Sequence, residues 1–69
     1  MDIQFYIDGA STTSHKAYSR LLYLLNKQGG DRVELNAIWD RALWPDEDGE
    51  AARDQLALID DRLEIIVND

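Results

Sequence analysis

The chain has 69 residues, the length of one small domain, which leaves little room to enclose an active site. Its composition, 45% hydrophobic and 30% charged, is typical of a folded globular protein and excludes a disordered chain. There is no cysteine, so disulfide bonds and thiolate metal sites are excluded. No apolar run is long enough for a membrane span or an export signal, and we expect a cytoplasmic protein without membrane contact.

The formal net charge of −7 is concentrated in the C-terminal part of the chain. Residues 1 to 39 carry four acids and four bases, whereas residues 40 to 69 carry ten acids and three bases. Nonspecific binding to nucleic acid depends mostly on Lys and Arg side chains that neutralise phosphates. The C-terminal part is therefore electrostatically unfavourable as a DNA-binding surface.

Residues 2 to 8 alternate between apolar and polar side chains, which predicts a half-buried strand. Asp8-Gly9 then predicts a turn. Ser and Thr side chains at residues 11 to 14 offer N-caps for a helix, which we expect Gly29-Gly30 to end. The apolar arc of that helix comprises Ala17, Tyr18, Leu21, Leu22, Leu24 and Leu25.

A second helix is predicted in the segment that follows the two glycines. Val33 and Leu35 could alternate in a strand, but from Leu35 onward the apolar residues recur at helical spacing. Pro45 disfavours helical geometry in the residue before it, so this helix should end near Trp44. A third helix should begin between residues 48 and 50, with a core stripe of Ala52, Leu56, Ile59 and Leu63.

Residues 63 to 69 alternate again and predict a C-terminal strand. Pairing of this strand with the N-terminal strand would satisfy backbone groups that both would otherwise leave unpaired. We therefore expect a single α+β domain over residues 1 to 69, with three helices and a small antiparallel sheet built from the N- and C-terminal strands.

Several short motifs follow one another in an order known from another group of proteins. They are a turn with an Asp-Gly step, a leucine-rich first helix, a glycine, and a sequence close to W-P-x-x-D-x-x-x-A-R-x-x-L with a later R-L. The residues concerned are Asp8-Gly9, residues 21 to 25, Gly30, Trp44-Pro45, Asp48, Ala52-Arg53, Leu56 and Arg62-Leu63. In this order they resemble the winged helix-turn-helix domains of OmpR/PhoB-type regulators, and most of all the antibiotic-regulatory-protein (SARP) and bacterial transcriptional activator group. The resemblance covers roughly residues 7 to 63.

The resemblance implies a winged-helix-like domain whose second and third helices form the helix-turn-helix. The wing would be short or absent, because six residues follow Leu63. It also implies a role in transcription regulation, through contacts to duplex DNA, to RNA polymerase, or to both. Trp44 would fill the gap between the helices of the motif. The candidate DNA-binding residues are Lys16, Arg20, Lys27, Arg53, Gln55 and Arg62.

The charge of the third helix supports an alternative function. The positions opposite its core stripe are acidic or apolar, whereas a helix in the major groove usually carries basic residues there. The domain could instead be an acidic protein-interaction module or inhibitor that keeps the fold without binding DNA, in the manner of a DNA mimic. Its partner would be a basic protein. The candidate partner surface comprises Asp46, Glu47, Asp48, Glu50, Asp54, Leu58 and Asp61.

Metal and catalytic sites find little support in the sequence. Aligning Gly49 with the glycine of an EF-hand loop places Trp44 and Gln55 where calcium needs carboxylates. Asp60 and Asp61 are consecutive, so on a helix they would point about 100° apart rather than toward one ion. His15, the single histidine, has no partner suited to a metal site. We expect no cofactor, no metal and no enzymatic activity.

A basic stripe with one aromatic residue is predicted on the outer face of the first helix. Lys16, Arg20, Tyr23 and Lys27 fall at i, i+4, i+7 and i+11. Such a stripe is either a solvated face or a contact surface for DNA phosphates or an acidic partner. Because the third helix of another copy is acidic, weak head-to-tail self-association is one hypothesis.

Overall fold

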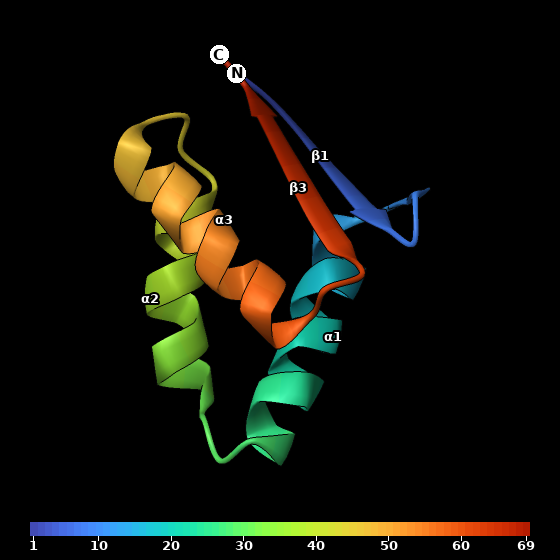
Figure 1. The fold of residues 1–69 in the computed structure, drawn as a ribbon, viewed down its shortest axis with the longest axis vertical. Helices are drawn as coiled ribbons and strands as arrows, with labels where there is room; N and C mark the ends of the chain where they lie inside the picture. The colour runs from blue at the N-terminus through green and yellow to red at the C-terminus, as the bar shows by residue number, and fades with distance from the viewer.

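The computed structural model describes all 69 residues and has three helices on one side of a three-stranded antiparallel sheet (Figure 1). The predicted α+β fold, with three helices and a small sheet built from N- and C-terminal strands, is confirmed. The elements in chain order are β1 (Asp2–Ile7), β2 (Ala10–Thr12), α1 (Ser14–Lys27), α2 (Arg32–Ala42), α3 (Glu47–Ile59) and β3 (Leu63–Asn68).

The sheet has the order β2-β1-β3, so that the two ends of the chain lie side by side (Figure 1). β1 pairs with β3 along its whole length, from Asp2 opposite Asn68 to Ile7 opposite Leu63. At its other edge β1 pairs with the three residues of β2. The single strand that follows α3 is thus part of the main sheet, and no wing hairpin is formed.

A tight hairpin at Asp8 and Gly9 produces β2, a strand that the sequence pattern did not predict. Both residues have positive φ, 53° and 80°. This matches the two-residue turn whose twist suits a β-hairpin, for which Asp-Gly is a favoured pair. The Ser and Thr cluster therefore serves two purposes, because β2 ends at Thr12 while Thr13 caps α1 by accepting a hydrogen bond from the N–H of Lys16.

The core lies between the sheet and the helices and includes a cluster of three aromatic rings. Trp39 of α2 stacks on Phe5 of β1, with ring centroids 5.6 Å apart, and Tyr18 of α1 meets Trp39 edge-on at 5.4 Å. These contacts join the sheet to two helices. The buried apolar residues are Phe5, Ala17, Leu21, Leu25, Leu35, Ala42, Ala52, Leu56 and Leu63.

Several sequence expectations for this region are wrong in detail. Trp44 is 56% exposed and does not fill the gap between helices; the tryptophan that packs against the core is Trp39, which is half-buried. Leu63 is buried as expected, but it belongs to β3, because α3 ends at Ile59. The segment that could have begun as a strand is helical from Arg32 onward, and α2 ends at Ala42, two residues before the expected position.

Candidate interaction surfaces

The first candidate site is the outward face of α3. Glu47, Glu50, Asp54 and Leu58 lie at i, i+3, i+7 and i+11, so their side chains share one side of the helix. The sequence places acids here partly for a local reason. Asp46 caps the helix by accepting a hydrogen bond from the N–H of Gly49 at 2.8 Å, and the carboxylates of the first turn interact favourably with the helix dipole.

Every residue predicted for the partner surface is exposed to solvent. Leu58 is 86% exposed, which is the largest exposure among the bulky apolar side chains. We call this set the α3 acidic surface; its members are Asp46, Glu47, Asp48, Glu50, Asp54, Leu58 and Asp61.

The joint between α2 and α3 holds this surface in place. Gly49 is buried, and a Cβ at this position would lie 1.9 Å from the carbonyl oxygen of Trp44 and 2.9 Å from that of Arg41. Only glycine lets the first turn of α3 approach the end of α2 so closely. The acidic surface therefore has a fixed orientation relative to α2.

Arg53, a candidate DNA-binding residue, belongs to the same joint. Its Nη1 donates hydrogen bonds to the carbonyl oxygens of Ala42 and Trp44, at 3.0 and 2.7 Å. Carbonyl groups at a helix C-terminus lack partners within the helix and attract a cation. Arg53 thus satisfies the end of α2, and its half-buried side chain points its Nη1 into the protein.

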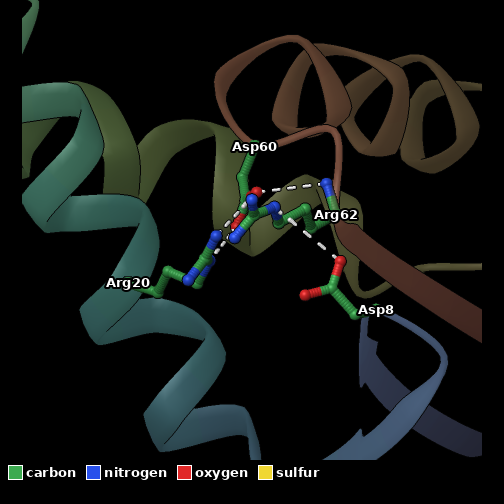
Figure 2. Close-up of polar contacts among 4 residues, drawn as sticks. All are labelled: Asp8, Arg20, Asp60 and Arg62. Atoms are coloured by element: carbon green, nitrogen blue, oxygen red, sulfur yellow. Dashed lines mark hydrogen bonds and ion pairs between the residues drawn. The ribbon is translucent and has the colours of Figure 1, made fainter.

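An ion pair connects the end of α3 to α1, with Arg20 and Asp60 pointing toward each other (Figure 2). Arg20 donates from Nε to one carboxylate oxygen of Asp60 and from Nη2 to the other, at 3.4 Å for the latter. The Asp60 side chain is only 2% exposed, whereas that of Arg20 is 34% exposed. Arg20 is therefore not a free member of the basic stripe, which corrects the expectation for the outer face of α1.

Asp60 is also bound by the backbone that follows it. Its Oδ1 accepts a hydrogen bond from the N–H of Arg62 at 3.1 Å. Burial raises the pKa of the Asp60 carboxyl, but the hydrogen bonds from Arg20 and Arg62 together with the charges of these two residues lower it by more, so the pKa lies below its ordinary value of 3.8. The hydrogen bond to Asp60 in turn raises the pKa of Arg20. Asp60 is ionised at neutral pH and connects α1, α3 and the start of β3.

Arg62 extends this group toward the hairpin. Its Nε lies 3.8 Å from Oδ1 of Asp8 in the β1–β2 turn, and both side chains are more than half exposed (Figure 2). An exposed pair at this distance contributes little to stability. It nevertheless places a carboxylate beside a cation that the sequence predicted for DNA contact.

The remaining candidate cations lie on α1. Lys16 and Lys27 are exposed, and Nζ of Lys27 lies 5.2 Å from the centroid of the Tyr23 ring. Such a cation–π contact is weak at an exposed site. Gln55 is exposed on α3. Of the six residues predicted for DNA contact, three arginines thus face acceptors or carboxylates of the protein itself: Arg20, Arg53 and Arg62.

The Arg20–Asp60 pair is the contact at the predicted sites that the sequence did not reveal. The two residues are 40 positions apart, so no local pattern connects them. The one available signal was the position of Asp60 directly after Ile59, at the end of an apolar helical stripe.

No pocket is found on the molecule, and no group of three or more His, Asp or Glu side chains is arranged to hold a metal ion. None of the three helices combines the length and apolar character needed to cross a membrane. Comparison with known proteins finds no matching protein family, no matching curated protein and no matching solved structure.

Proposed function

We propose that this domain is a protein-interaction module in which the α3 acidic surface binds a basic segment of a partner protein. The observation that carries the proposal is the distribution of available charge. The carboxylates of this surface are solvent-exposed, whereas Arg20, Arg53 and Arg62 each face a carbonyl or carboxylate oxygen of the protein itself. The region around α3 is thus a source of negative potential.

Leu58 adds an apolar contact to this surface. It lies one turn beyond Asp54 on the same side of α3 and is 86% exposed. A partner helix with alternating Lys or Arg and apolar residues could pair its cations with the carboxylates and cover Leu58. Charge complementarity would direct the approach and set the specificity, while the apolar contact would slow dissociation.

Duplex DNA is the alternative ligand, and it fits the available charges less well. Phosphate contacts would have to come from the exposed cations outside the ion pairs, which are Lys16 and Lys27 of α1 and Arg32 and Arg41 of α2, while the carboxylates of α3 would repel phosphates. The resemblance to transcriptional regulators remains a reason to look for the partner among cytoplasmic proteins of the transcription machinery. On this proposal the domain binds and does not catalyse.

The test is a pair of fluorescence anisotropy titrations at about 50 mM salt, where charge contacts are strong. One uses a labelled basic peptide with Lys and Leu at helical spacing, and the other a random-sequence DNA duplex. We expect the peptide to bind and the duplex not to bind. If the duplex binds more tightly than the peptide, the domain is a DNA-binding one and the proposal is wrong.

Matched charge reversals test whether the peptide binds at the α3 acidic surface or responds only to the net charge of the domain. The double substitution Glu50→Lys and Asp54→Lys should weaken peptide binding about tenfold or more, which corresponds to at least about 1.4 kcal/mol. The control, Asp2→Lys with Glu64→Lys, changes the net charge equally on the outer side of the sheet. Equal losses in both variants would mean that only the net charge matters, and would refute a defined site on α3.

A further inference from the structure

A long free strand edge lies on the side of the sheet opposite β2. β3 pairs with β1 on one side only, because the strand order is β2-β1-β3. It has six residues, contains Ile65, Ile66 and Val67 in succession, and has neither proline nor lysine. Proline, lysine and shortness are the usual means by which proteins prevent an edge strand from pairing with another chain. At the other edge β2 has only three residues.

The hydrogen bonds of the sheet show which backbone groups of β3 point outward. In an antiparallel ladder, opposite residues that exchange two backbone hydrogen bonds alternate with opposite residues that exchange none. The N–H of Asp8 donates to the carbonyl of Arg62, so Asp8 and Arg62 form a pair of the first type. The two types alternate along an antiparallel ladder, which directs the backbone groups of Glu64, Ile66 and Asn68 toward β1. The groups of the residues between them, Ile65 and Val67, therefore point to the free edge.

These outward groups have no partner within the molecule. Neither Ile65 nor Val67 takes part in any of the turn, loop or cap hydrogen bonds of the backbone. α3 ends next to the start of β3, and the two elements then diverge, so that the C-terminal half of the strand is the part farther from α3 (Figure 1). This half carries the unpaired donors and acceptors that a further strand needs.

We propose that β3 pairs antiparallel with β3 of a second copy, joining two three-stranded sheets into one continuous sheet. The favoured register places Ile66 opposite Ile66 of the other copy. Ile65 of each chain then lies opposite Val67 of the other, and each of these pairs exchanges two hydrogen bonds between outward groups. The two chains are then related by a two-fold axis at Ile66, so the same outward backbone groups find hydrogen-bond partners on both chains.

The side chains of β3 are complementary in this register. Glu64 lies opposite Asn68 of the other copy, whose amide can donate to the carboxylate, and the pairs between them are apolar. A shift of the register by two residues would bring Ile65 opposite Ile65, but it would also place Glu64 opposite Ile66. The Glu64 carboxylate would then lose the Asn68 amide as its cross-strand partner, so the register with Ile66 at the centre is preferred.

The salt dependence of the dissociation constant distinguishes this dimer from a head-to-tail association between the basic stripe of α1 and the α3 acidic surface. Each chain carries a formal net charge of −7, so two copies repel each other, while the contacts along β3 are backbone hydrogen bonds and apolar side chains. Screening by salt weakens the repulsion without affecting those contacts. The dimer through β3 should therefore become tighter at high salt, whereas contact between the basic stripe of α1 and the α3 acidic surface should weaken.

The test compares Val67→Pro with Val67→Ala in analytical ultracentrifugation over a range of protein concentrations, at about 50 and about 500 mM salt. Val67 is outside the core cluster and its N–H faces the free edge, so proline removes an outward donor while the ladder to β1 keeps its bonds. Alanine removes most of the side chain and keeps the donor. We expect wild type and Val67→Ala to dimerise more tightly at high salt, and the dissociation constant of Val67→Pro to be at least about tenfold higher.

Amide hydrogen exchange of the unmodified protein gives a second readout that does not depend on the fold of a variant. The amide of Ile66 should be protected at every concentration, whereas those of Ile65 and Val67 should become protected only as the dimer forms. The proposal is overturned if the protein stays monomeric at high salt and millimolar concentration. It is also overturned if a dimer forms while the amides of Ile65 and Val67 stay unprotected. Neither result depends on the peptide binding proposed for α3.

Discussion

Gly49 is the residue at which a single methyl group should have the largest effect on this fold. Replacing Gly49 by Ala places a Cβ 1.9 Å from the carbonyl oxygen of Trp44, 2.8 Å from its carbonyl carbon and 2.9 Å from the carbonyl oxygen of Arg41. All three atoms belong to the backbone, so no side-chain rotation can relieve the contact. The first turn of α3 would have to move by about 1.5 Å from the end of α2 to reach an ordinary separation.

The expected cost follows from what that movement disturbs. Overpacking of this kind typically costs about 1–3 kcal/mol, and sometimes more. The movement also lengthens the hydrogen bonds of Arg53 to the end of α2 and strains the cap at Asp46, each of which contributes about 1 kcal/mol. Alanine has a helix propensity better by about 1 kcal/mol. The net loss is about 2–4 kcal/mol, a large share of the 3–10 kcal/mol or so expected for a domain of this length.

Urea unfolding followed by circular dichroism and tryptophan fluorescence measures this loss. With a slope of about 1 kcal/mol per molar urea, the midpoint should fall by about 2 M or more, or the chain should fail to fold. Ala51→Gly at the exposed neighbouring turn of α3 is the control, and it should cost about 1 kcal/mol through helix propensity alone. If Gly49→Ala stabilises the protein, propensity dominates and the close approach of α3 to the end of α2 does not exist in solution.

The remaining predictions concern the ionic contacts and a cap. Arg20→Gln should cost about 2 kcal/mol or more in urea unfolding, because it leaves the buried Asp60 carboxylate with one remaining hydrogen bond. Since the pKa of Asp60 is lower in the folded chain than the unfolded value of 3.8, its contribution is present above that value and lost as the pH falls through the folded pKa. Thermal melts at pH 7 and pH 3 should therefore show a larger decrease in wild type than in Arg20→Gln, and equal decreases would contradict this account. Arg53→Met should cost about 1–2 kcal/mol, while Gln55→Met, one exposed position on the same helix, should change stability by less than about 0.5 kcal/mol. Asp46→Ala should cost about 1 kcal/mol in the same assay, whereas Asp46→Asn should retain most of the stability because it can still cap the helix.

The elements that could be predicted from sequence are those specified by a local pattern. The strand alternation of residues 2 to 8 and of residues 63 to 69, and the leucine spacing of α1, each arise from one buried face and need no distant information. β2 has no such pattern, since its three residues are small or polar. It forms because the turn at Asp8 and Gly9 returns the chain alongside β1, and an Asp-Gly step after an alternating strand is itself a hairpin signal.

The two tryptophans show how well the helical periodicity of the sequence predicts which side chains pack against the core. Trp39 falls on the helical repeat of Leu35 and Ala42, and it is the one that packs against the core. Trp44 lies after the end of α2, outside that repeat, and is mostly exposed. Its assignment to the interior came from the family resemblance rather than from its position in the helix. The periodicity was thus the better guide to which tryptophan packs against the core.

The exposed acids of α3 could be predicted from sequence because they lie opposite a clear apolar stripe, but the fate of the arginines could not. Whether an arginine meets solvent or an internal acceptor depends on segments distant in sequence. Arg20 faces a carboxylate 40 positions away, and Arg53 reaches back 11 positions to the end of α2. A count of basic residues therefore overestimates the positive charge that this chain can offer to DNA.

The two proposed surfaces also have a consequence when taken together. The α3 acidic surface and the edge of β3 share no residue, so a dimer formed through β3 would carry two copies of the partner site related by a two-fold axis. A partner with two basic segments joined by a linker of suitable length would then bind the dimer more tightly than either segment alone, without any new contact. The affinity for such a tandem peptide should rise with protein concentration in wild type and in Val67→Ala, whereas Val67→Pro should need a protein concentration at least about tenfold higher for the same rise.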